Sequence, residues 1–168
     1  MERLPLFLDV KGKRCVVVGG GEVALRKATL LARAGAKLHV VAPELGDEMA
    51  ALCARESALI CPTEFQSCCL DSATLVIAAT DSLAVNSAVS VAAQAQSIPV
   101  NVVDQPDLCT FIVPAIVDRS PILIAISSGG ASPILARSIK RLIETLLPAR
   151  IDRLAALLRE LREVVKTK

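Results

Sequence analysis

The feature that most constrains this chain is a short β-branched run that stops in three glycines and continues at once into a helical pattern. The run ends at Gly19-Gly-Gly21, and apolar side chains then repeat at helical spacing. This order predicts a strand, a tight turn and a helix N-terminus. In the pattern G-x-G-x-x-A, Gly19 permits the turn, Gly21 lets the backbone approach a pyrophosphate, and Ala24 keeps the helix close to the sheet. The stretch therefore predicts a dinucleotide site, with a plain glycine-rich turn as the alternative.

Composition narrows the class of protein. Of the 168 residues, 53% are hydrophobic but only 2% are aromatic, so small aliphatic side chains must build the core, as is typical of parallel sheets covered by helices. A net charge of +2 and the scarcity of aromatic residues argue against a nucleic-acid partner. No apolar run reaches the roughly 18 residues of a membrane span, and the N-terminus does not resemble a secretory signal. We expect a cytoplasmic protein without a membrane partner.

Strand and helix patterns alternate after the glycine turn, which indicates a Rossmann-like, doubly wound parallel α/β sheet over residues 1–112. The predicted strands are 14–18, 37–42, 59–61, 73–79 and 98–103, with helices over 21–33, 44–55 and 83–96 between them.

The organisation changes after residue 112. Two apolar runs, 111–117 and 121–126, predict a hairpin. A predicted helix follows the hairpin and ends at Pro148. We expect a dimerisation region over 113–147 and a C-terminal helical segment over 148–168. A hairpin and two helices are too little for an independent core, so the sequence predicts a homodimer.

Polar residues follow three of the predicted strands, where ligands bind in open α/β sheets. Glu44 comes late after the second strand; it either contacts the adenosine ribose or lies in the first turn of the next helix, and the choice between NAD and NADP stays open. Thr80 and Asp81 line the cofactor crevice or, on the alternative interpretation, Asp81 or Ser82 caps a helix. Asp104 is a candidate proton acceptor beside the nicotinamide, or simply a turn residue in Asp-Gln-Pro.

The histidine and the cysteines give weaker evidence for a functional site. His39 lies inside a strand, which favours a structural role. The cysteines form no C-x-x-C pair, and most of them are expected to be small buried hydrophobes. A metal site from Cys61, Cys68 and Cys69, or metal handling by Cys109, is the less favoured interpretation. We predict no resident metal.

The loop Ser127-Ser128-Gly129-Gly-Ala-Ser-Pro presents hydroxyl and N–H groups at a helix start, with Arg137 on the helix that it opens. Such a place suits a carboxylate, although it is also an ordinary capped turn.

Several separated motifs resemble one family. They are Leu4-Pro-Leu-Phe7, the glycine turn through Lys27, Ala78-Ala-Thr-Asp81, Asn101-Val-Val-Asp104-x-Pro106, Phe111-Ile-Val-Pro114 with Asp118-Arg-Ser-Pro121, and Ser127-Ser-Gly-Gly-x-Ser-Pro133. In this order they are similar to the N-terminal module of siroheme synthase, the precorrin-2 dehydrogenase and sirohydrochlorin ferrochelatase family.

The resemblance implies NAD-dependent oxidation of precorrin-2 to sirohydrochlorin, followed by insertion of ferrous iron into this tetrapyrrole to give siroheme. It implies that Asp104 acts in both steps, as general base and as acceptor of pyrrole protons. It also implies an intertwined homodimer.

The resemblance further implies roles for individual site residues. Glu22, Val23, Pro43 and Glu44 match positions that contact NAD in the family. We expect Asn101, Ser127, Ser128, Gly129 and Arg137 to bind substrate. Ser128 matches a serine that can be phosphorylated in relatives, where added charge would repel a carboxylate-rich substrate.

One alternative from another class stays open. A dimeric regulatory domain that senses NAD without catalysis would need the glycine loop but would have no use for Asp104 or for a tetrapyrrole-sized cleft.

Overall fold

The computed structural model describes residues 3–148, 150–151, 153–154, 157–158 and 162. The chain divides into two compact units, Leu6–Ile112 and Met1–Pro5 with Val113–Lys168, and each is considered by itself. Most of the predicted C-terminal helical segment lies outside the described residues. No helix among the described residues is long and apolar enough to cross a membrane.

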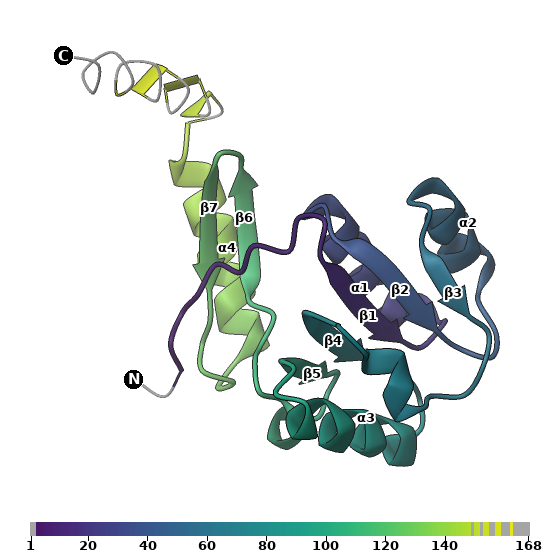
Figure 1. Cartoon of the computed structure of the whole chain (residues 1–168). Helices are drawn as coiled ribbons and strands as arrows, with labels where there is room; N and C mark the ends of the chain where they lie inside the picture. Colours follow the sequence, from purple (N-terminus) through teal and green to yellow (C-terminus); the bar gives the residue numbers. More distant parts are fainter. Residues whose placement is uncertain (1–2, 149, 152, 155–156, 159–161, 163–168) are drawn as a thin grey trace. The chain divides into compact units, whose positions relative to one another are not determined.

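The first unit is a five-stranded parallel sheet with helices on both faces (Figure 1). Its elements are β1 (Arg14–Val18), α1 (Glu22–Arg33), β2 (Lys37–Val41), α2 (Asp47–Arg55), β3 (Leu59–Cys61), the 3₁₀ turn η1 (Ser67–Leu70), β4 (Leu75–Ala78), α3 (Leu83–Ala95), β5 (Val100–Val102) and the 3₁₀ turn η2 (Pro106–Leu108). The strand order β3-β2-β1-β4-β5 confirms the doubly wound fold. Because the order reverses between β1 and β4, the crevice for a ligand opens at the carboxyl ends of these two strands.

Alternation along β1 divides the core into two layers. Cys15 and Val17 belong to a buried cluster with α1 and α2, whereas Val16 and Val18 belong to a cluster with α3. Successive side chains of a strand point to opposite faces, so each face of the sheet has its own apolar contact with helices. This arrangement explains why the strands are almost wholly aliphatic.

Several predicted boundaries were wrong. The strands β4 and β5 are shorter than expected. The helix predicted from residue 44 begins only at Asp47, because the preceding loop packs its backbone against the glycine turn, where the Gly46 N–H donates to the Gly20 carbonyl at 3.0 Å.

The second unit holds the antiparallel hairpin β6 (Ala115–Arg119) and β7 (Ile122–Ile126), followed by α4 (Pro133–Leu146). The helix α4 contacts both strands. Its apolar side chains stay largely exposed, and Ala136 is the residue of this helix that is buried. The expected hairpin and helix are therefore present, with little core between them.

Candidate functional site

The three glycines of the turn meet different surroundings. Gly19 has a φ of +126°, and a Cβ there would lie 2.4 Å from the Ala79 carbonyl oxygen. A Cβ on Gly20 would lie 2.0 Å from the Glu44 carbonyl oxygen, whereas one on Gly21 would meet nothing within 4 Å. Gly19 and Gly20 are thus required by packing against the loops after β4 and β2. Gly21 faces open space, as a residue beside a pyrophosphate must.

The N-terminus of α1 leaves its first N–H groups free for a ligand. Gly21 is the N-cap and supplies no side-chain acceptor, and the first N–H group with a helical partner is that of Leu25, which donates to the Gly21 carbonyl at 2.9 Å. The N–H groups of Glu22, Val23 and Ala24 are therefore available, as at any helix start. Ala24 is completely buried, which fits the packing role that the motif predicts.

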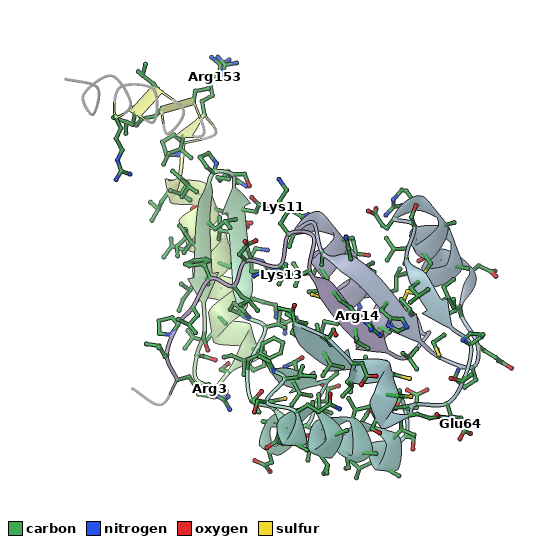
Figure 2. The ribbon with its side chains drawn as sticks, in the orientation of Figure 1. Arg3, Lys11, Lys13, Arg14, Glu64 and Arg153 are labelled. Atoms are coloured by element: carbon green, nitrogen blue, oxygen red, sulfur yellow. The ribbon has the colours of Figure 1, made fainter. Side chains whose placement is uncertain are left out.

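A cavity of about 660 Å³ lies in front of this helix start, at the carboxyl ends of β1, β2 and β4. Its lining residues are Val18–Val23, Val41–Glu44, Thr63–Phe65, Ala79–Asp81 and Val85. Glu44 and Glu64 are exposed on this lining, and Figure 2 shows Glu64 on the loop that leaves β3.

The residues present fit a dinucleotide, and NAD better than NADP. The free N–H groups of α1 suit a pyrophosphate. The cavity lining includes the carboxylates of Glu44 and Glu64 and no lysine or arginine, so it offers acceptors to ribose hydroxyls and no cation to a 2′-phosphate. Glu44 lies in the loop before α2, so its alternative placement in the first helical turn was wrong.

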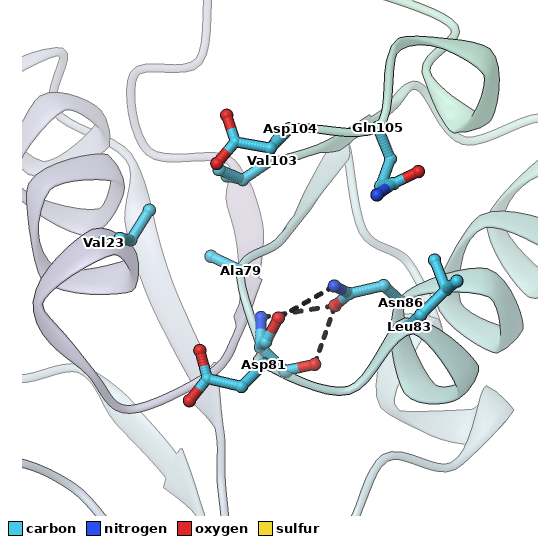
Figure 3. Close-up of a pocket in the computed structure, with 9 residues that line it drawn as sticks. Val23, Ala79, Asp81, Leu83, Asn86, Val103, Asp104 and Gln105 are labelled. Atoms are coloured by element: carbon cyan, nitrogen blue, oxygen red, sulfur yellow. Dashed lines mark hydrogen bonds between the residues drawn. The ribbon is translucent and has the colours of Figure 1, made fainter.

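A smaller cavity of about 220 Å³ adjoins the larger one (Figure 3). The two cavities share the lining residues Val23, Ala79, Thr80 and Asp81. Asp104 and Gln105 line the smaller cavity from the end of β5, together with Leu83, Asn86 and Val103. The structure thus brings Asp104 next to the cofactor crevice, as the sequence predicts.

Asp104 occupies a tight turn as well as the cavity. Its φ of +58° is left-handed, a conformation that Asp and Asn tolerate better than other residues with a side chain. The Gln105 N–H donates to the Val102 carbonyl at 3.3 Å and closes the turn. Asp104 is therefore a turn residue that also lines the cavity, and its role as proton acceptor stays a prediction.

Lys27 is a neighbour of Asp104 that sequence reasoning did not single out. It lies one helical turn after Val23 on α1 and is half-buried. Burial lowers the pKa of Lys27 most, the charge of Arg26 lowers it further, and Asp104 and Cys109 act in the opposite direction. Only the folded chain brings this cation near Asp104, so no sequence signal identified it.

Thr80 is held by a residue that the sequence analysis also missed. The Asn86 amide, 5% exposed, forms three hydrogen bonds to Thr80, and Figure 3 draws them as dashed lines. Ser82 caps α3, because its hydroxyl accepts the Val85 N–H at 3.4 Å. Capping by Ser82 and lining by Thr80 and Asp81 therefore both occur. The signal that could have identified Asn86 is an asparagine on the buried, mostly small and apolar face of a helix.

The residues predicted to bind substrate line neither of the two cavities. Asn101 is buried, does not line either cavity, and donates its amide N–H to the Phe111 carbonyl at 3.1 Å. In the second unit, the Ser128 hydroxyl donates to the Ser132 carbonyl at 3.0 Å, and the Ser127 hydroxyl accepts the Gly129 N–H at 3.1 Å. Arg137 is exposed on α4. The capped turn is thus present, and anion binding by this loop stays a prediction.

His39 has the structural role that its place in a strand predicted. The imidazole is 6% exposed, and its Nδ1 accepts a hydrogen bond from the Arg14 guanidinium. Burial, with the positive charge of Arg14, lowers the pKa of His39. A neutral ring is the form that can accept this bond.

The cysteines do not assemble a metal site in the part of the chain that the structure describes. No group of three histidine, cysteine or acidic side chains there is placed to hold a metal ion. Cys61, Cys68 and Cys69 therefore give no support to the metal alternative. The Cys109 thiol contacts backbone instead, accepting the Val102 N–H at 3.1 Å.

Comparison with known proteins agrees with this geometry. A family model described as "Putative NAD(P)-binding" matches residues 6–115, and one described as "Sirohaem biosynthesis protein central" matches residues 119–146. The chain is 55% identical to siroheme synthase from Methylobacillus flagellatus and 48% identical to that from Saccharophagus degradans, over 99% of its own length and 36% of theirs. It therefore spans about a third of the length of these relatives.

Among solved structures, the chain resembles "SirC, precorrin-2 dehydrogenase". The TM-score is 0.78 at 26% sequence identity, over 98% of this chain and 81% of that one. The family match confirms the expected nicotinamide dinucleotide cofactor. The chain belongs to the putative NAD(P)-binding family, and over nearly its whole length it is similar to about a third of the length of siroheme synthases.

Proposed function

We propose that this chain catalyses the NAD-dependent oxidation of precorrin-2 to sirohydrochlorin. The observation that carries the proposal is the position of Asp104 in a cavity that shares four lining residues with the dinucleotide cavity. A carboxylate there is next to the place where a substrate carbon must meet the cofactor. Similarity to a structure named precorrin-2 dehydrogenase and to siroheme synthases supports the choice of substrate.

NAD, when bound, would supply the acceptor for the hydride that the substrate loses, and the residues of the chain bind it and take the proton. The N–H groups that open α1 hold the pyrophosphate, and Glu44 accepts hydrogen bonds from a ribose hydroxyl. Val23 and Ala79 supply apolar walls between the two cavities. Asp104 accepts the proton that leaves the substrate with each hydride, so the products are sirohydrochlorin, NADH and the protonated carboxyl group, which releases its proton to solvent.

We also propose that ferrous iron, as a substrate, enters the same cleft and gives siroheme. Asp104 would then take protons from pyrrole nitrogens as the metal binds them. The name of the curated relatives supports this second step.

We also propose that the protein is a cytoplasmic homodimer, and the second unit supports the dimer. On α4, Ile134, Leu142 and Leu146 are 70%, 59% and 71% exposed. A second copy of the chain would cover such a face.

We keep Ser127, Ser128, Gly129 and Arg137 as proposed carboxylate contacts of the tetrapyrrole, and Ser128 as a proposed phosphorylation site. Asn101 stays in this proposal only through its amide, which donates to the Phe111 carbonyl and so holds the segment after η2.

The experiment is NADH formation from precorrin-2 and NAD by the native protein, Asp104→Asn and Asp107→Asn. Asparagine tolerates the left-handed backbone, so the first variant removes the base and keeps the turn. Loss of a general base predicts a fall in kcat of at least about 100-fold, with the Kd for NAD within about twofold of the native value. Asp107 is an exposed carboxylate in η2 outside both cavities, so its variant should keep native turnover.

Native turnover that persists in Asp104→Asn would keep the enzyme and remove the proposed base. No turnover by the native protein, with NAD still bound, would favour the NAD-sensing regulatory domain instead.

A further inference from the structure

One buried side chain, Asn86, ties the wall between the two cavities to α3. This wall, Ala79–Asp81, lies at the end of β4 and lines both cavities. Asn86 lies in α3, which starts after the wall, and helical side chains lean toward the N-terminus of their helix. The amide of Asn86 is therefore aimed back at the wall.

The contact between Asn86 and Thr80 uses every backbone polar group of Thr80. The Asn86 Oδ1 accepts the Thr80 N–H at 3.2 Å and the Thr80 hydroxyl at 2.8 Å. The Asn86 Nδ2 donates to the Thr80 carbonyl at 2.9 Å. Because a main-chain N–H can only donate and a carbonyl can only accept, these partners fix which end of the amide faces which atom. Asn86 thus bonds both main-chain polar groups of Thr80, as a neighbouring strand does for a residue in a sheet, although Thr80 lies beyond the end of β4.

The position of the wall shows which half of the dinucleotide it meets. The pyrophosphate belongs at the helix start after β1, and the ribose of the adenosine half belongs beside the loop after β2. In the strand order, β2 and β4 lie on opposite sides of β1. The wall after β4 thus faces the nicotinamide half, on the side where Asp104 lies.

We propose that Asn86 is a positioning residue that holds the nicotinamide half of the cofactor at its working distance from Asp104. It acts through Thr80 and touches no reacting atom. Only the kinetic part of this proposal rests on the proposed dehydrogenase function, because cofactor binding tests the positioning role independently of catalysis.

The first experiment compares binding of NAD and of ADP-ribose, which lacks the nicotinamide ring, by calorimetry. In Asn86→Ala we expect the Kd for NAD to rise at least fivefold and the Kd for ADP-ribose to stay within twofold. Ser90→Ala is the matched control. Ser90 lies one turn further along α3, is also buried, and donates its hydroxyl to the Leu108 carbonyl at 2.7 Å, outside both cavities. It should change neither Kd.

A second variant removes the Thr80 hydroxyl, which bonds the Asn86 Oδ1 and also the N–H and carbonyl groups of Ser82. Thr80→Val loses the hydroxyl and keeps both main-chain bonds to Asn86, so its effect on the Kd for NAD should be smaller and in the same direction. The double variant should match Asn86→Ala, because the two side chains act as one unit.

Turnover gives the kinetic readout. With precorrin-2 and saturating NAD, Asn86→Ala should lower kcat at least tenfold and leave the KM for precorrin-2 within twofold, while Ser90→Ala keeps native values. Equal loss of NAD and ADP-ribose affinity, or no loss of either, would overturn the positioning role, whatever the turnover. Absence of turnover in the native protein would overturn the dehydrogenase function and leave the binding comparison to decide the role of Asn86.

Discussion

The two units of this chain use similar apolar side chains and bury them to very different extents. In the parallel sheet, all four residues of β4 and four of the five in β1 are buried. In β7, half-buried and exposed residues alternate, and α4 buries Ala136 and exposes its large aliphatic side chains. Helices cover both faces of the first sheet, whereas the hairpin contacts one helix of its own unit. Topology, and not the hydrophobicity of the side chains, therefore decides which unit has its own core and the cofactor cavity.

We expect the largest effect on stability from a pair of substitutions that compares a core position of the sheet unit with an exposed position of α4. Ile77, 1% exposed in β4, contacts the cluster between the sheet, α1 and α2, so Ile77→Ala should lower the free energy of unfolding by about 3 kcal/mol. Leu142→Ala, at a side chain 59% exposed on α4, should change it by less than about 0.5 kcal/mol in a monomer. Urea unfolding followed by circular dichroism measures both.

Sedimentation velocity adds the complementary measurement. If α4 is a dimer surface, Leu142→Ala should weaken self-association and Ile77→Ala should not. A large loss of stability in monomeric Leu142→Ala would contradict the contrast between the units.

The next effect distinguishes packing from cofactor binding inside the sheet unit. Gly20→Ala drives a Cβ against the Glu44 carbonyl, so we expect a loss of about 2 kcal/mol in the free energy of unfolding and weakened NAD binding. Gly21→Ala meets open space, so its stability should change by less than about 1 kcal/mol, the size of an N-cap effect. Its Kd for NAD should nevertheless rise at least about tenfold, because the new methyl group occupies the approach of the pyrophosphate. Equal stability of the two variants would show that the loop after β2 does not rest on Gly20.

The smallest effect concerns the pH dependence of the sheet unit. Burial raises the pKa of the Cys15 thiol from 9.0 to about 11, although the nearby charge of Lys13 acts in the other direction. The unfolded chain therefore releases this proton first, and the stabilisation that is complete below pH 9 is lost as the pH rises toward 11. At pH 10 the loss should be about 1.4 kcal/mol, one pKa unit of the shift.

Unfolding of the native protein and of Cys15→Ala between pH 7.5 and pH 10 isolates this contribution, because all other groups titrate in both. The native protein should lose more stability over this range. Parallel pH profiles would show that Cys15 ionises in the fold as readily as in the unfolded chain.

The alternation of strand and helix patterns was enough to predict the parallel sheet, and the glycine turn was enough to predict its cofactor. Both depend on periodicity and on residue types within a few positions of one another, such as Gly19, Gly21 and Ala24, which a chain displays without being folded. Asp104 could be identified for a similar reason, since parallel strands always present their carboxyl ends at one edge. The boundaries around Glu44 could not, because the Gly20 carbonyl that holds this loop comes from a distant part of the chain.

The tertiary structure alone decided the contacts that complete the site. The steric need for Gly20 arises from the Glu44 carbonyl, and the effect of Asp104 on Lys27 depends on where the fold places α1 relative to the turn after β5. Asn86 reaches Thr80 only because Ser82 starts α3 where it does. Local sequence patterns carry no information on which distant backbone atoms will approach one another. Strand order and helix placement set those distances, and they exist only once the sheet has formed.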